Sequence, residues 1–244
     1  MVPPSHLPAL TVAVILPILN EAAHLDETLS ALLELHNFDE VIVVDGGSTD
    51  TSVEIVCKFM SSGEPDSHAV PILIQSPCGR ARQMQMGAQA TEADVLLFLH
   101  ADSTLPPGAA DDIRDAINEG HSWGRFDVRL SGRHILFRAV ERLMNWRSRL
   151  TGVATGDQAI FVQRDVYRML GGYAPLALME DIEFSTRLKW VGKPAYLSGP
   201  VIASSRRWEE NGIVRTILLM WTLRFLCWLG VSPDRLARWY YRRP

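Results

Sequence analysis

Three short apolar runs in the first half of the chain each end in polar or acidic side chains, and an acidic pair, Glu180 and Asp181, follows much later. The side chains after the three runs are Pro17, Asn20 and Glu21, then Asp45, Gly46 and Ser48, and finally His100, Ala101 and Asp102. The carboxyl ends of the strands in an open α/β sheet line the ligand crevice. These acids are therefore predicted to face a ligand and not the core.

The residues after the second run indicate recognition of a nucleoside. Asp45 can accept hydrogen bonds from the imide of a uracil or from ribose hydroxyls, and Gly46 lets the backbone approach a ligand closely. Ser48 or Thr49 can cap the next helix, whose free N–H groups would then face the same crevice. The alternative is an aspartate that only forms a turn.

His100 and Asp102 lie two residues apart, on the same side of an extended chain. Hard oxygen ligands suit Mg²⁺ and Mn²⁺, so Asp102 can hold either cation against a diphosphate, with His100 beside it. The alternative for His100 is a hydrogen-bonded structural imidazole. Asn20 and Glu21 follow Pro17, which fixes the backbone before them, and Asn20 either contacts the ligand or caps the next helix.

A basic loop and an acidic helix start supply the remaining chemistry. Gly79 precedes Arg80 and Arg82, and an arginine here can pair with diphosphate oxygens; the alternative is a solvated basic face. Glu180 and Asp181 open a predicted helix, where anions are favoured, and one carboxylate can take the proton from an incoming hydroxyl. Direct displacement at an anomeric carbon would then invert its configuration. The alternative is acids that only complement the helix start.

Two later stretches are candidates for binding an acceptor or a phosphate. Gly156 and Asp157 precede a predicted strand, and Arg207 and Trp208 lie in the basic end of the chain. Trp208 can stack on a sugar face and Arg207 can reach a phosphate. Packing and surface charge are equally open explanations.

Alternating strand and helix patterns must position these residues. Apolar runs at 12–16, 41–44, 70–75 and 95–99, with helical periodicity between them, predict parallel βαβ units. Alternation at 126–130 predicts a mixed or antiparallel extension of the sheet, followed by a long helix from residue 135 and a strand at 159–162. We predict an α/β fold with one Rossmann-like mixed sheet flanked by helices at 11–205. A loose tail at 1–10 and an apolar, basic helical tail at 206–244 complete the chain.

Composition narrows the class of protein. With 244 residues, 47% of them apolar, the chain can bury one substantial core, and its formal charge of −4 gives no case for nucleic-acid binding. Three scattered cysteines indicate neither a disulfide framework nor a zinc site, and the first residues do not read as a signal peptide, so we expect a cytoplasmic protein. The stretch 213–229 is too short and too charged to span a membrane. It either lies on the inner face of a membrane or packs over the core with snorkelling arginines.

Taken jointly, these motifs resemble family-2 glycosyltransferases of the GT-A fold, over residues 11–229. The resemblance implies a nucleotide-sugar donor, usually UDP-linked, metal-assisted departure of the diphosphate, and inversion. By match of motif, Asp45 falls on the nucleoside-binding acid, Asp102 on the last acid of the Asp-x-Asp metal motif, and Asp181 on the catalytic base. His100 replaces the first acid of that motif. Arg206-Arg207-Trp208 lacks the Gln of the Gln-x-x-Arg-Trp motif of processive synthases, so single transfer is expected.

Within that family the chain is similar to a compact bacterial subgroup labelled as arsenosugar-biosynthesis or radical-SAM/selenium-associated transferases. The acceptor stays open between a soluble hydroxyl compound and a lipid carrier. Two other functions compete with glycosyl transfer. One is a non-catalytic protein that binds a nucleotide or a membrane through the basic tail. The other is a sugar nucleotidyltransferase, although the loop after the first strand lacks the glycine-rich phosphate cradle of that class.

Overall fold

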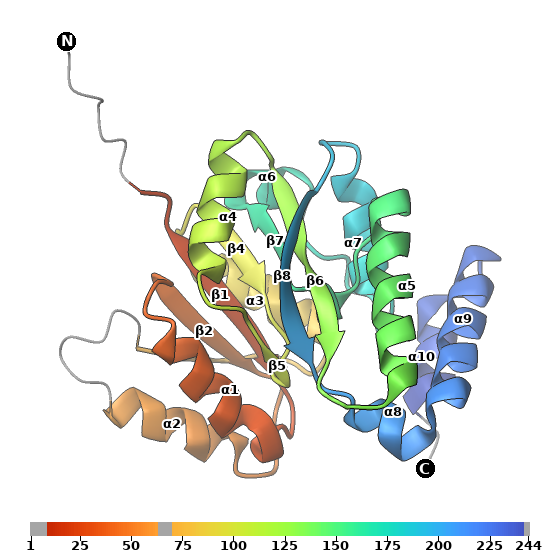
Figure 1. The fold of residues 1–244 in the computed structure, drawn as a ribbon. Helices are drawn as coiled ribbons and strands as arrows, with labels where there is room; N and C mark the ends of the chain where they lie inside the picture. Colours follow the sequence, from red (N-terminus) through yellow and green to blue (C-terminus); the bar gives the residue numbers. More distant parts are fainter. Residues whose placement is uncertain (1–8, 63–69, 242–244) are drawn as a thin grey trace.

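One mixed eight-stranded sheet forms the centre of the protein, in a computed structural model that describes residues 9–62 and 70–241 (Figure 1). The strand order is β3-β2-β1-β4-β7-β6-β8-β5. The strands are β1 (Val12–Ile18), β2 (Glu40–Asp45), β3 (Ile72–Gln75), β4 (Val95–Phe98), β5 (Ser103–Thr104), β6 (Trp123–Leu130), β7 (Ile160–Gln163) and β8 (Ala195–Ala203).

The first four strands are parallel and are joined by helices, as their sequence pattern predicts. β7 then runs antiparallel to both of its neighbours, β4 and β6, which confirms the predicted mixed extension. The helices are α1 (Ala22–Glu34), α2 (Ser52–Ser62), α3 (Arg80–Gln89), α4 (Ala109–Asn118), α5 (Ile135–Thr151), α6 (Arg164–Met169), α7 (Glu180–Leu188), α8 (Arg206–Asn211), α9 (Ile213–Trp228) and α10 (Pro233–Tyr241), with a 3₁₀ turn at Gly156–Gln158.

Helices cover both faces of the sheet because successive side chains of a strand point to opposite faces. On one face, Val14 and Leu16 of β1 pack in a cluster with side chains of α1, α2 and α4. On the other, Ile15 packs with α3, α6 and α7. The parallel strands are buried on both faces and therefore read as continuous apolar runs in the sequence.

The C-terminal helices lie at one end of this layered core. Side chains of α5 and α9 share a small apolar cluster with β6, while α9 and α10 pack on the residues that precede α7. Figure 1 shows α5, α9 and α10 together beyond β6, away from α1 and α2. No helix within 9–62 and 70–241 is long and apolar enough to cross a membrane. The predicted N-terminal tail falls largely on residues 1–8, outside the described ranges.

The predicted cap of α2 is wrong, and so is the alternative that Asn20 caps α1. Ser48 and Thr49 do not cap α2, which begins only at Ser52, and the side chain of Asn20 does not cap α1. Instead Asn20, in a left-handed conformation with φ of 55°, accepts hydrogen bonds at its Oδ1 from the backbone N–H groups of Thr49 and Asp50. The polar side chains thus join two loops in place of ending two helices, a pairing that local sequence does not reveal.

Candidate active site

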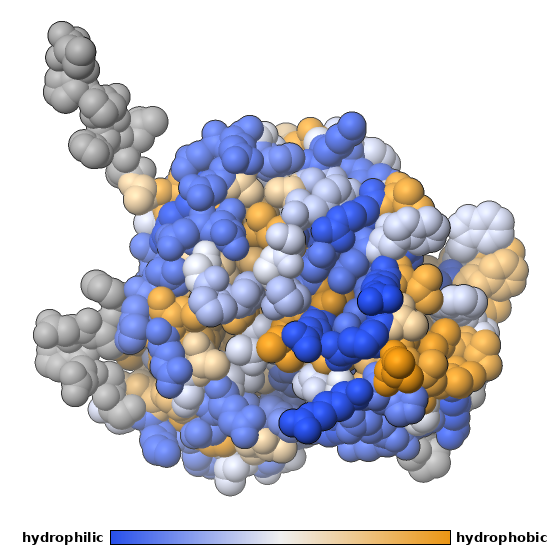
Figure 2. Space-filling view, in the orientation of Figure 1, coloured by the Kyte–Doolittle hydropathy of each residue, from blue (hydrophilic) through white to orange (hydrophobic). Residues whose placement is uncertain are grey.

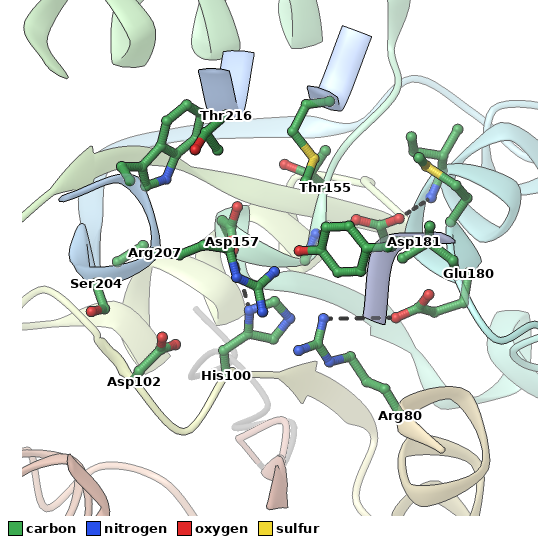
Figure 3. Close-up of a pocket in the computed structure, with 18 of the residues that line it drawn as sticks. Arg80, His100, Asp102, Thr155, Asp157, Glu180, Asp181, Ser204, Arg207 and Thr216 are labelled. Carbon is green, nitrogen blue, oxygen red and sulfur yellow. Dashed lines mark hydrogen bonds and ion pairs between the residues drawn. The ribbon is translucent and has the colours of Figure 1, made fainter. Parts of the chain in front are cut away.

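A pocket of about 210 Å³ lies where the carboxyl ends of β1 and β4 meet the start of α7 and the helices α8 and α9 (Figure 3). Twelve of the residues predicted from the sequence line it: Pro17, Glu21, Arg80, His100, Ala101, Asp102, Gly156, Asp157, Glu180, Asp181, Arg207 and Trp208. Six do not, namely Asn20, Asp45, Gly46, Ser48, Gly79 and Arg82. Residues from six separate segments therefore converge on one cavity.

The start of α7 places two carboxylates in the pocket. Asp181 accepts a hydrogen bond from the backbone N–H of Gly156 at 2.7 Å and another from that of Ile182 at 2.7 Å. Glu180 is almost fully buried, and its Oε1 lies 3.9 Å from Nη1 of Arg80. Burial raises the pKa of Glu180, the neighbouring Asp181 raises it further, and Arg80 opposes both. The two acids thus differ in environment although they are adjacent in sequence.

His100 contacts the 3₁₀ turn at Gly156–Gln158. Its Nδ1 lies 3.3 Å from Oδ1 of Asp157, and its ring packs so closely on Gly156 that a Cβ there would lie 2.4 Å from Nε2. Desolvation raises the pKa of Asp157, but the hydrogen bond and charge of His100, then Arg80 and Arg207, together hold it below its ordinary value. Figure 3 shows Arg207 extending toward this pair.

Asp102 and Glu21 form a second acidic corner. Burial raises the pKa of Glu21, and the charge of Asp102 raises it further, against the opposing charges of Arg206 and Arg80. In Figure 3, Asp102 and Glu180 lie on opposite sides of His100. No group of three metal-ligating side chains gathers within the part of the chain that the structure describes. A cation shared with substrate phosphates needs only one or two protein carboxylates, and Asp102 in the pocket wall fits that role.

The loop after β2 is built around Asp45 and adjoins the pocket without lining it. Asp45 is 1% exposed, and its carboxylate accepts hydrogen bonds from the backbone N–H groups of Gly47 and Ser48. Ser48 in turn accepts one from the N–H of Asn20. In this structure Asp45 therefore shapes the turn, and its predicted contact with a nucleoside stays a prediction.

Sequence reasoning missed three residues that shape the site. Gln83 is buried, and its Nε2 donates to the carbonyl oxygens of Ile18 and Val44, which holds the ends of β1 and β2 in place. Arg206 and Arg224 bring two more guanidinium groups to the pocket. Gln83 comes directly after the basic residues Arg80 and Arg82, and this position could have identified it as a candidate. Arg224 lies in an apolar stretch that gives no indication of a pocket.

Known proteins are similar to this chain in sequence and in fold. The profile of the family described as "Glycosyl transferase family 2" matches residues 13–169. The undecaprenyl-phosphate 4-deoxy-4-formamido-L-arabinose transferase of Yersinia pestis is 30% identical over 156 residues, which is 62% of this chain and 47% of that protein. The chain thus spans about half the length of the curated relatives it matches.

Solved structures agree on the architecture. The fold is similar to that of S. aureus TarS 1-349 in complex with UDP, with a TM-score of 0.65 and 18% identity over 80% of this chain and 60% of that one. It is also similar to the mannosyltransferase PcManGT from Pyrobaculum calidifontis in complex with GDP-Man and Mn²⁺, with a TM-score of 0.59 and 22% identity over 80% of this chain and 56% of that one. The mixed sheet flanked by helices is the predicted GT-A fold. Because its family profile covers more than half of the chain, this protein belongs to glycosyl transferase family 2.

Proposed function

We propose that the protein transfers a sugar from a nucleoside-diphosphate sugar to an acceptor hydroxyl. One observation carries the proposal: the acids at the start of α7 share a pocket with strand-end acids and with basic groups. Glycosyl transfer needs a base on one side of the anomeric carbon and a counter-charge for the diphosphate on the other. The pocket contains both kinds of group.

Arg80 and Arg207 are the proposed partners of the diphosphate. Both line the pocket, and a guanidinium can hold two phosphate oxygens at once. A UDP-linked sugar is the expected donor, in keeping with the UDP bound by TarS. The GDP-Man bound by PcManGT makes a GDP-linked sugar the other donor to test. Asp45 and the loop that it shapes are the proposed contacts of the base and ribose.

Asp181 is the proposed base. The ion pair of its neighbour Glu180 with Arg80 suits Glu180 to holding the arginine in position. Asp181 instead faces the pocket with hydrogen bonds from two backbone N–H groups, which fix the orientation of its carboxylate. Taking the hydroxyl proton here would support direct displacement with inversion.

Asp102, with His100 beside it, would hold Mg²⁺ or Mn²⁺. The cation, when bound, would offset charge on the departing diphosphate. Single transfer, membership of the compact bacterial subgroup and a cytoplasmic location, with or without contact to a membrane, stay predictions. The loop after β1 is not a glycine-rich cradle: it contains Leu19, Asn20 and Glu21, and Asn20 is hydrogen-bonded to the loop after β2. The nucleotidyltransferase alternative therefore gains no support.

The test is nucleotide release from UDP-, GDP-, dTDP- and ADP-sugars, with Mn²⁺, Mg²⁺ or chelator. We expect one nucleotide to be released in a metal-dependent way by the wild type and not by Asp181→Ala. Equal release by the two proteins would contradict the role of Asp181. Nucleotide binding without release by either protein, across a panel of acceptors, would favour the non-catalytic alternative.

A further inference from the structure

Two guanidinium groups between α5 and α9 have N–H donors that are buried and unused. Within residues 9–62 and 70–241, Nε and Nη2 of Arg147 and Nε of Arg224 lie out of contact with solvent and have no hydrogen-bond partner. Burial and then the charge of Arg224 lower the pKa of Arg147 to about 10, against the opposing charge of Asp181. Two like charges held together with buried donors unused cost folding stability, and a bound anion would offset that cost.

This guanidinium pair borders the candidate active site. Arg224 lines the pocket together with Asp181, and the charge of Asp181 acts on Arg147. Thr216, Met220 and Leu223, on the same side of α9 as Arg224, also line the pocket. The pair stands on α5 and α9, whereas the groups proposed for the donor diphosphate, Arg80 and Arg207, stand on α3 and α8. An anion bound there would therefore belong to the acceptor.

The other side of α9 is an uncovered apolar stripe. Five large side chains recur along it at alternating steps of four and three residues, which places them on one face of the helix. They are 57–79% exposed: Val214, Leu218, Trp221, Phe225 and Trp228. A face of this kind on a soluble domain marks a contact surface.

α5 extends the same surface. Leu143, Trp146 and Leu150 are 54–64% exposed and follow one another at steps of three and four residues. α5 and α9 pack on a common cluster that includes Phe137 and Ile217. Figure 2 shows apolar side chains gathered over α5 and the neighbouring α9, with strongly hydrophilic side chains beside them. We call the exposed apolar side chains of the two helices the α5/α9 face.

The charge around the α5/α9 face selects its partner. α5 and α9 together carry six arginines: Arg138 pairs with Glu141, Arg149 pairs with Asp127, and Arg147 and Arg224 are the pair at the pocket. The other two, Arg142 and Arg215, are exposed, and α9 carries no acidic residue. Two copies joined through this face would bring like charges together. An anionic bilayer offers the complementary charge, and the interfacial region of a bilayer favours tryptophan beside arginine.

We infer that the acceptor is a phosphate-bearing lipid, with its phosphate bound between Arg147 and Arg224 and the α5/α9 face seated on the bilayer that carries it. That this lipid is the acceptor rests on the proposed function, but its binding to the protein does not depend on turnover. The phosphate held by the guanidinium pair would present one of its own oxygens to the anomeric carbon. The bond from this oxygen to C1 forms as the bond from C1 to the donor diphosphate breaks, the nucleoside diphosphate leaves, and Asp181 takes the proton of a phosphate that is still protonated.

The test is co-sedimentation with three kinds of vesicle: phosphatidylcholine alone, phosphatidylcholine doped with a prenyl phosphate, and phosphatidylcholine doped with phosphatidylglycerol to the same surface charge. We expect the prenyl phosphate vesicles to bind about tenfold more tightly than the phosphatidylglycerol vesicles, because a phosphate monoester offers more oxygens to two guanidiniums. Phosphatidylcholine alone should bind least.

Variants separate the two parts of the site. The double variant Arg147→Gln with Arg224→Gln should abolish the preference for prenyl phosphate vesicles. The double variant Arg147→Lys with Arg224→Lys should keep part of this preference. Arg142→Gln, an exposed arginine on the same helix, should leave it unchanged. Trp221→Ser with Phe225→Ser should lose binding to both anionic vesicles.

Met169→Gln is the control for loss of apolar surface, because Met169 is exposed on α6, away from the α5/α9 face. A preference that survives the Gln pair would overturn the phosphate site. Equal affinity for soluble glycerol phosphate and for prenyl phosphate vesicles would overturn the inference that the ligand is a lipid. UDP binding is measured separately, so its failure would count against the proposed function and not against this inference.

Discussion

Replacing Asp181 by Asn tests the proposed base with little change in shape. The substitution keeps one side-chain oxygen and removes the negative charge. The carboxylate now accepts hydrogen bonds from the backbone N–H groups of Gly156 and Ile182, both at 2.7 Å. The amide can accept only one of these, because its NH₂ group is a donor and would face the other N–H.

Two magnitudes follow from this geometry. Loss of one hydrogen bond to a charged group, in a partly buried setting, should lower the free energy of unfolding by about 1–2 kcal/mol. For a chain of this length that corresponds to a fall in Tm of about 2–8 °C. Loss of a general base should lower kcat by about 10²–10⁴-fold, which is about 3–5 kcal/mol in the activation barrier. The effect on rate therefore exceeds the effect on stability.

The assay compares kcat, donor affinity and Tm for three proteins, namely the wild type, Asp181→Asn and Glu183→Gln. Glu183 lies on the same helix, and its carboxylate pairs with Arg187 at 2.6 Å. Its substitution removes an acid from α7 at some cost in stability but leaves the pocket intact. We expect Asp181→Asn to lose kcat while donor affinity stays unchanged, and Glu183→Gln to keep kcat.

One outcome would refute the assignment of the base. If folded Asp181→Asn turns over within about threefold of the wild type, no proton passes to this carboxylate in a step that limits the rate. The nucleophile would then need no base, as for an acceptor that attacks through an already ionised oxygen.

Three further substitutions test how the site is built. Gly156→Ala should destabilise the protein by about 1–3 kcal/mol and displace His100, because the new Cβ would lie 2.4 Å from Nε2 of His100. Thermal unfolding measures this loss of stability. The control is Gly192→Ala, which has open space around the new Cβ and should leave stability unchanged. Glu180→Gln tests the raised pKa of Glu180. The stability that the neutral carboxyl contributes is present below its ordinary pKa of 4.5 and is lost as the pH rises through the pKa of the folded protein. At neutral pH the Tm of the variant should therefore exceed that of the wild type, and this gain should vanish below pH 4.5. A gain that is independent of pH would contradict the shift. Gln83→Leu removes the side-chain donor to the carbonyl oxygens of Ile18 and Val44, although that of Ile18 keeps the N–H of Gly46, and should cost about 1–3 kcal/mol in urea unfolding. An unchanged midpoint would show that the strand ends hold their positions without it.

Local pattern was sufficient for most of the architecture. The continuous apolar runs of β1, β2 and β4 follow from burial of parallel strands on both faces, and the acids that follow them mark the strand ends. The start of α7 at Glu180 was also predictable, because acids are favoured in the first turn of a helix. These features depend on a few neighbouring residues, and the sequence therefore contains them.

The site itself depends on contacts between distant segments. Only the folded chain shows that Asn20 reaches the loop after β2, that Asp181 accepts from Gly156, and that His100 turns toward Asp157. The same holds for Arg147 and Arg224, which stand in helices whose local sequence suggests only an apolar or basic face. Strand and helix periodicity determines which side of an element is buried. Which group a polar side chain meets there depends on how the elements pack, and that is decided by the tertiary structure.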